Sequence, residues 1–99
     1  AVVVHIGRRS GRTFRTPVHL DRVDDSFVIA LAYGANADWV RNVLANGGAV
    51  VQLGGRSYLT TNPAVLPSDQ VIAQLPPRQQ RAITMFGVPK CLRLDIVGD

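Results

Sequence analysis

The sequence predicts a small, mainly β domain with inserted helices (α+β), built as an antiparallel barrel. The chain has 99 residues, which is the length of a single domain. About six segments are β-branched or alternate between apolar and polar residues, and one amphipathic helical segment follows the third of them. Such alternation with short connections favours a barrel of about six mostly antiparallel strands over a βαβ sheet.

Three strands are expected in the N-terminal third. Residues 2–6 are mostly β-branched, and residues 7–13 form a loop with two glycines. Residues 14–23 are predicted as one second strand. Pro17 lacks an N–H, so we expect an edge, a bulge or the beginning of the strand there. Residues 26–32 are strongly apolar, which predicts a central strand.

A helix is expected over residues 37–46. Asn36 is a plausible N-cap, Asp38 places a negative charge in the first turn, and Gly47 is suited to end the helix. Asn42 follows Trp39 by three residues and therefore lies beside the buried stripe. The apolar stripe itself has i,i+4 spacing and comprises Trp39, Val40, Val43 and Leu44.

The C-terminal half is predicted to contain a hairpin, short helices and a last strand. The hairpin turns at Gly54 and Gly55, and the helices are interrupted by Pro76 and Pro77. The last strand alternates apolar and polar residues, so one of its faces is half-exposed. The expected ranges are strands 49–55, 56–66 and 90–97, with the helices inside 67–87.

The net charge of +4 favours an anionic partner: nucleic acid, an anionic membrane, or a phosphorylated or polycarboxylate small molecule. The single cysteine, Cys91, excludes an internal disulfide framework and suits a reducing cytoplasm, with its thiol inert and half-buried. No spacing suggests a metal site, and no serine has the G-x-S-x-G pattern. If the protein is an enzyme, a cofactor supplies the chemistry.

The start of the chain is expected to lack a native segment, because Ala1 is not methionine and a strand pattern begins at once. Such a segment would carry a membrane-surface helix or a lid. No apolar run approaches the ~20 residues of a membrane span. We therefore expect a cytoplasmic protein, with membrane association through the preceding segment as an alternative.

The stretch GRRSGRTFRTP carries four arginines within eight positions: Arg8, Arg9, Arg12 and Arg15. A glycine-bearing turn lets backbone N–H groups converge on an anion, and guanidinium groups bind phosphate or carboxylate oxygens in a forked geometry. A solvated basic turn is an equally good interpretation of the loop alone. Nucleic-acid binding is the weaker alternative, because the aromatic residues are scattered and no recognition motif is present.

The stretch YGANADW has two interpretations. It is either a plain strand-to-helix connection with Trp39 as core filler, or a platform for a cofactor. In the second case N–H groups of the helix N-terminus face a pocket, with Trp39 and Asn42 under a ring system. An amide beside an apolar stripe needs hydrogen-bond partners, which a ligand can provide.

Taken together, GRRSGRTFRTPV and DWVRNVLANGG resemble motifs of the deazaflavin (F420)-dependent nitroreductase and quinone reductase family. Members are small split β-barrel proteins of actinobacteria. They commonly have G-R-x-[ST]-G-x-x-R-x-x-P in the first loop and W-x-x-N-L-x-A-N-P in the helix. The resemblance runs over nearly the whole chain and implies one flavin-reductase-like split β-barrel domain over residues 1–99.

The resemblance implies hydride transfer from reduced coenzyme F420 to a quinone, a nitro compound or an activated alkene. No metal is implied, and Tyr33 is the candidate for polarising the substrate. The implied cofactor residues are Arg8, Arg9, Ser10 and Gly11 at the phosphate and polyglutamate tail, Arg15, Thr16 and Pro17 in the same groove, and Trp39 and Asn42 near the cofactor.

Other functions stay open at this point. A carrier on the same barrel would bind the deazaflavin or FMN without catalysis, and FMN is the second candidate cofactor. A basic nucleic-acid-binding barrel is a third, less favoured hypothesis, so no specific nucleic-acid partner is expected. The protein is expected to be a monomer or a homodimer.

Overall fold

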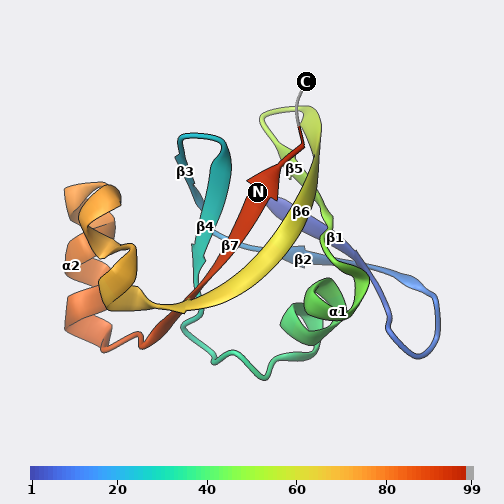
Figure 1. Ribbon diagram of the computed structural model, residues 1–99, viewed down its shortest axis with the longest axis horizontal. Helices are drawn as coiled ribbons and strands as arrows, with labels where there is room; N and C mark the ends of the chain where they lie inside the picture. The colour runs from blue at the N-terminus through green and yellow to red at the C-terminus, as the bar shows by residue number, and fades with distance from the viewer. Residues whose placement is uncertain (98–99) are drawn as a thin grey trace.

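The computed structural model describes residues 1–97, which form one curled antiparallel sheet with two α-helices (Figure 1). The helices are α1 (Asp38–Asn46) and α2 (Pro77–Phe86), with short 3₁₀ turns at Ser68–Gln70 and Ile72–Gln74. The strands are β1 (Val2–Ile6), β2 (Thr13–Pro17), β3 (Asp21–Val23), β4 (Ser26–Ala30), β5 (Val50–Leu53), β6 (Arg56–Pro67) and β7 (Lys90–Ile96).

The sheet curls because of the long strand β6. The strand order is β2-β1-β5-β6-β7-β4-β3, so β6 pairs with β5 through its first residues and with β7 through the rest. The register shifts between Thr61 and Ala64, and Asn62 has a positive φ of 51°. A bulge bends and twists its strand, and Figure 1 shows β6 sweeping in an arc across the sheet. This architecture confirms the predicted split β-barrel.

The strand expected over residues 14–23 is two strands, so the sheet has seven strands rather than six. β2 ends at Pro17, which has no N–H to continue a ladder. β2 pairs only with β1 and β3 only with β4, at opposite ends of the strand order. Pro17 therefore lies on an edge strand, as its chemistry predicted.

Two hydrophobic cores occupy opposite faces of the sheet, as the alternation along β4 shows. Phe27 and Ile29 belong to the larger core with Val40 and Val43 of α1. Val28 belongs to the smaller core, which lies against α2. Cys91 is buried in this smaller core, not half-buried as expected, because α2 and the 3₁₀ turns cover that face.

Helix α1 begins one residue later than predicted. Its N-cap is Ala37, without a side-chain cap, so the expected cap at Asn36 is wrong. The end is as predicted, because Gly47 adopts the left-handed conformation with φ of 70°. Val40 and Val43 are fully buried, whereas Leu44 is 41% exposed and lies at the margin of the stripe.

The predicted hairpin and C-terminal helix are also confirmed. Gly54 and Gly55, both with positive φ, join β5 to β6. Pro77 starts α2 at a position where its missing N–H costs nothing. Within residues 1–97, neither helix has the length and apolar character needed to cross a bilayer.

Candidate functional site

The loop between β1 and β2 is a tight, preformed turn. The Gly7 N–H donates to the Arg12 carbonyl at 2.7 Å, and the Gly11 N–H donates to the Gly7 carbonyl at 3.0 Å. The Ser10 hydroxyl accepts from the Arg12 N–H at 3.2 Å. A Cβ on Gly7 would lie 2.6 Å from Ser10 Oγ and 2.9 Å from a Phe14 ring carbon, so a side chain there forces the Ser10 and Phe14 side chains to shift.

Arg8 fastens this loop to helix α1. Asn42 Oδ1 accepts from the Arg8 backbone N–H at 3.1 Å and from Arg8 Nη1 at 2.7 Å. Arg8 Nη2 also forms an ion pair with Asp38 at 3.2 Å, and the Arg8 side chain is only 20% exposed. Charge-assisted bonds of this kind are stronger than neutral ones. Both terminal nitrogens of the Arg8 guanidinium are therefore bonded to residues of α1.

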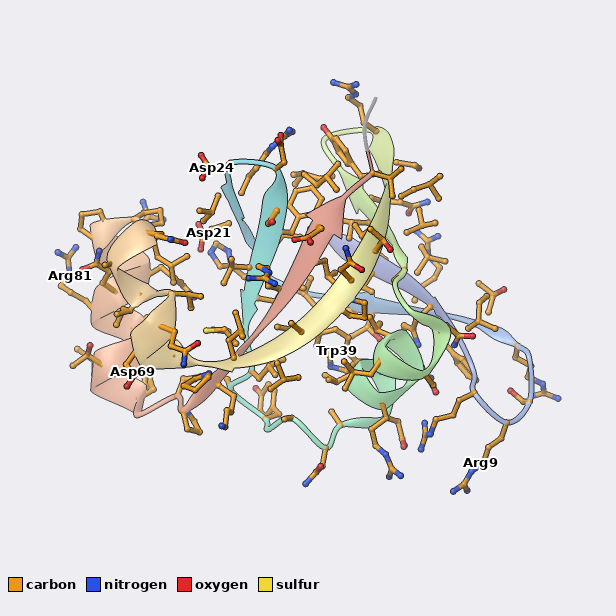
Figure 2. The ribbon with its side chains drawn as sticks, in the orientation of Figure 1. Arg9, Asp21, Asp24, Trp39, Asp69 and Arg81 are labelled. Carbon is orange, nitrogen blue, oxygen red and sulfur yellow. The ribbon has the colours of Figure 1, made fainter. Side chains whose placement is uncertain are left out.

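Arg9 is an exposed cation of the same turn, as is Arg12. No residue among 1–97 forms a hydrogen bond or ion pair with the Arg9 guanidinium, and Figure 2 shows it extending outward from the loop. The loop and α1 border an open cavity of about 440 Å³, which we call the basic hollow. Its lining residues are His5, Gly7, Arg8, Arg9, Ser10, Phe14, Asp38 and Asn42.

His5 is buried at the inner wall of the basic hollow, where it is 4% exposed. Its Nδ1 lies 3.1 Å from Asn42 Nδ2, and its Nε2 lies 2.9 Å from Thr16 Oγ1. The ring stacks on Phe14 with centroids 5.7 Å apart. Burial lowers the pKa of His5 below its ordinary value, because an imidazolium would lose its hydration there.

A second cavity of about 650 Å³ lies beside the first, and we call it the apolar groove. Trp39 is half-buried and lies on the side of α1 that faces the middle of the molecule (Figure 2). Phe86 and Tyr33 form an exposed aromatic rim. The lining residues are Thr16, Pro17, Val18, His19, Ile29, Ala30, Ala32, Tyr33, Ala37, Trp39, Gln79, Ala82, Ile83, Phe86 and Val88.

The two cavities are neighbours along both β2 and α1. Phe14 lines the basic hollow, and Thr16, two residues later on the same face of β2, lines the apolar groove. In α1, Asp38 lines the first cavity and the adjacent Trp39 lines the second. The basic hollow and the apolar groove are therefore adjacent, one beside the arginine loop and the other beside Trp39.

A protein-family model described as F420H(2)-dependent quinone reductase matches residues 1–86. The chain belongs to this family. The match includes both cavity-forming motifs, and it confirms the resemblance, the oxidoreductase class and coenzyme F420 as the cofactor. A search of curated proteins finds no significant match.

The residues of the two cavities suit coenzyme F420. A phosphate and polyglutamate tail requires cations, and the basic hollow offers the exposed guanidinium of Arg9, whereas most N–H groups of the turn are bonded within the protein. A planar deazaflavin ring requires an apolar slot, and the apolar groove lies against Trp39. Both volumes lie within the range of small-molecule sites, about 300–1,000 Å³. Within residues 1–97 no three His, Cys, Asp or Glu side chains are grouped to hold a metal ion.

Most of the predicted site residues line one of the two cavities, and two of them line neither. Gly11 lies at the turn of the loop and lines neither. Arg15 also lines neither, because strand alternation directs it to the other face of the sheet, where it binds Gln52. The basic hollow receives Arg8, Arg9, Ser10 and Asn42, and the apolar groove receives Thr16, Pro17, Tyr33 and Trp39.

Some residues of the cavities were not predicted. His5 was not among the predicted site residues, although its alternation with the buried Val3 puts it on the inner face. Asp38 was predicted only as a helix-dipole partner and also binds Arg8. The groove wall from α2 had no sequence motif to reveal it.

Proposed function

We propose that the protein reduces quinones with F420H₂ held across both cavities. The supporting observation is the adjacency of a basic hollow and an apolar groove, in a chain whose residues 1–86 match the quinone reductase family. Nitro compounds and activated alkenes are proposed as further acceptors, because a planar electrophile of either kind has the same need for an apolar slot.

In this proposal the chain binds and orients while the coenzyme supplies the hydride. Arg9 binds the anionic tail, and Arg8 holds the loop on α1 so that the exposed cation is correctly placed. Trp39 and the walls of the apolar groove align two planar rings and exclude water between them. Such alignment contributes several kcal/mol to catalysis by removing the entropy cost of orientation.

Tyr33 stays a prediction as the group that polarises the substrate. Its side chain lines the groove but is 99% exposed, so its hydroxyl is surrounded by water. A hydrogen bond made there replaces one already made to solvent and contributes little. A donor deeper in the groove would act more strongly, because electrostatic interactions strengthen where water is excluded.

The experiment that tests this function is oxidation of F420H₂ by a 1,4-naphthoquinone, followed by the returning absorbance of the oxidised coenzyme. We expect turnover that requires the folded protein, the coenzyme and the quinone together. Binding of the coenzyme without turnover of the naphthoquinone, a nitroarene or an unsaturated lactone would instead support the carrier function.

Replacement of Arg9 by alanine is expected to weaken coenzyme binding about tenfold, which corresponds to a lost charge-assisted bond of roughly 1.5 kcal/mol. The effect should shrink at high salt, because Arg9 is exposed and its field is screened. The measurement is the dissociation constant of oxidised F420 at two salt concentrations.

Arg41→Ala is the matched control for this prediction. It removes the same charge from an exposed position of α1 that lines neither cavity. If both variants weaken binding equally, net charge and not the basic hollow determines the affinity. If neither weakens it, the assignment of the tail to Arg9 is wrong.

A further inference from the structure

The orientation of the Asn42 amide is fixed by its neighbours. Its Oδ1 faces two obligatory donors of Arg8, the backbone N–H at 3.1 Å and Nη1 at 2.7 Å. A flipped amide would set donors against donors, so the oxygen must face Arg8. The Nδ2 of Asn42, which can only donate, therefore faces His5 Nδ1 at 3.1 Å.

This orientation determines the tautomer of His5. Since Asn42 Nδ2 is a donor, His5 Nδ1 must accept, and the hydrogen of the neutral ring resides on Nε2. Protonation of Nδ1 would set that N–H against the amide of Asn42. The burial that lowers the pKa of His5 acts in the same direction and keeps the ring neutral.

The fixed tautomer in turn determines what the Thr16 hydroxyl can do. His5 Nε2–H donates to Thr16 Oγ1 at 2.9 Å, which occupies the hydroxyl as an acceptor. Its own hydrogen has no acceptor among residues 1–97. Thr16 also lines the apolar groove, on the sheet face that carries His5 and Val3.

We propose that the Thr16 hydroxyl is the hydrogen-bond donor of the apolar groove, and that it binds a ring carbonyl oxygen. His5 and Asn42 are positioning residues, which keep this hydroxyl in the donating state and link it to Arg8 in the basic hollow. The proposal deepens the proposed function and rests on it. The carbonyl belongs either to the deazaflavin ring or to the quinone, and hydrogen bonding to it is the chemistry that both share.

Thr16 suits this role better than Tyr33 and His19, two other polar residues of the groove. Tyr33 is almost wholly exposed, and the His19 side chain is 68% exposed and paired with Asp21. Thr16 is half-buried, and a chain of hydrogen bonds lies behind it. A donor that is oriented before the ligand arrives has little reorganisation left to undergo.

The test compares Thr16→Val, which loses the hydroxyl, with Thr16→Ser, which retains it. Thr13→Val is the control, since Thr13 lies on the same strand and lines neither cavity. Each protein is titrated with oxidised F420 through Trp39 fluorescence, and KM and kcat are measured with 1,4-naphthoquinone. We expect Thr16→Val to weaken F420 binding or the kinetic constants with the quinone about fivefold, which is the effect of one neutral hydrogen bond. Thr16→Ser should stay close to the parent, and Thr13→Val should be unchanged.

The F420 titration and the quinone kinetics together show which molecule carries the bound carbonyl. A weaker F420 complex with an unchanged quinone KM assigns it to the coenzyme, whereas unchanged F420 binding with an altered KM or kcat assigns it to the quinone. Equal behaviour of folded Thr16→Val and the parent in both arms overturns the inference, as does a serine variant no better than valine. A parent that binds no F420 instead overturns the proposed function.

Nitrogen-15 NMR of His5 tests the positioning step without any ligand. A ring nitrogen that carries hydrogen and one that carries only a lone pair resonate in well-separated regions. We expect an unprotonated Nδ1 and a protonated Nε2 in the parent at neutral pH. The opposite tautomer, or a charged ring, would overturn the proposed role of His5.

Discussion

Replacement of Asn42 by leucine is expected to lower the free energy of unfolding by about 3 kcal/mol, although leucine is similar in size and suits an apolar stripe. Asn42 is 5% exposed, and its amide joins His5, the Arg8 backbone and the Arg8 guanidinium. Leucine would leave buried polar groups on both partners without a hydrogen bond, and that desolvation cost exceeds the gain in apolar packing.

Urea unfolding followed by circular dichroism measures this effect, and Arg41→Leu is the control on the exposed face of the same helix. The control should change stability by less than about 0.5 kcal/mol, as exposed substitutions usually do. F420 binding by Asn42→Leu should also weaken, because the loop loses its anchor on α1. A stability loss no larger than that of the control would show that the Arg8–Asn42–His5 cluster does not hold this site together.

Replacement of Gly48 by alanine is expected to destabilise the protein by at least about 3 kcal/mol. Gly48 has φ of 147°, and an added Cβ would lie far inside contact distance of the Thr60 carbonyl oxygen and 2.9 Å from the Thr60 carbonyl carbon. The strand cannot easily move away, because the Ala49 carbonyl accepts from the Thr60 N–H at 3.0 Å and from the Thr60 hydroxyl at 2.6 Å.

Gly47→Ala is the matched control, one residue earlier in the chain. Gly47 also has a positive φ, of 70°, but a Cβ there meets no atom within 4 Å. Its cost should therefore be only the left-handed backbone penalty of about 1 kcal/mol. Equal losses of stability in the two variants would mean that backbone conformation alone, and not the close approach of β6, requires glycine after α1.

Local patterns were sufficient to predict most elements of the fold. The β-branched run at β1, the paired glycines at the hairpin and the glycine that ends α1 each act within a few residues. The division of residues 14–23 was not predictable in this way. It depends on β2 pairing with β1 while β3 pairs with β4 at the far edge of the sheet, and such long-range pairing leaves no periodic trace.

The sequence indicated the residue types that line the candidate site, but not the contacts between them. The arginines and glycines of the first loop indicated an anion site, and Trp39 indicated an apolar platform. From the sequence, Arg8 and Arg9 were predicted to have the same role. In the structure, Arg8 is hydrogen-bonded to Asn42, 34 residues away, whereas Arg9 is exposed. The partners that Asn42 was expected to find in a ligand are supplied by the protein itself, through Arg8 and His5.

The most direct test of the central claim is a titration of the protein with oxidised coenzyme F420, followed by the fluorescence of Trp39, the single tryptophan. FMN, which has a phosphate and a similar ring but no polyglutamate tail, is titrated in parallel. We predict saturable quenching by F420 at concentrations at which FMN has little effect. The absence of saturable quenching in a folded sample, or equal binding of FMN, would contradict an F420 site formed by the basic hollow and the apolar groove.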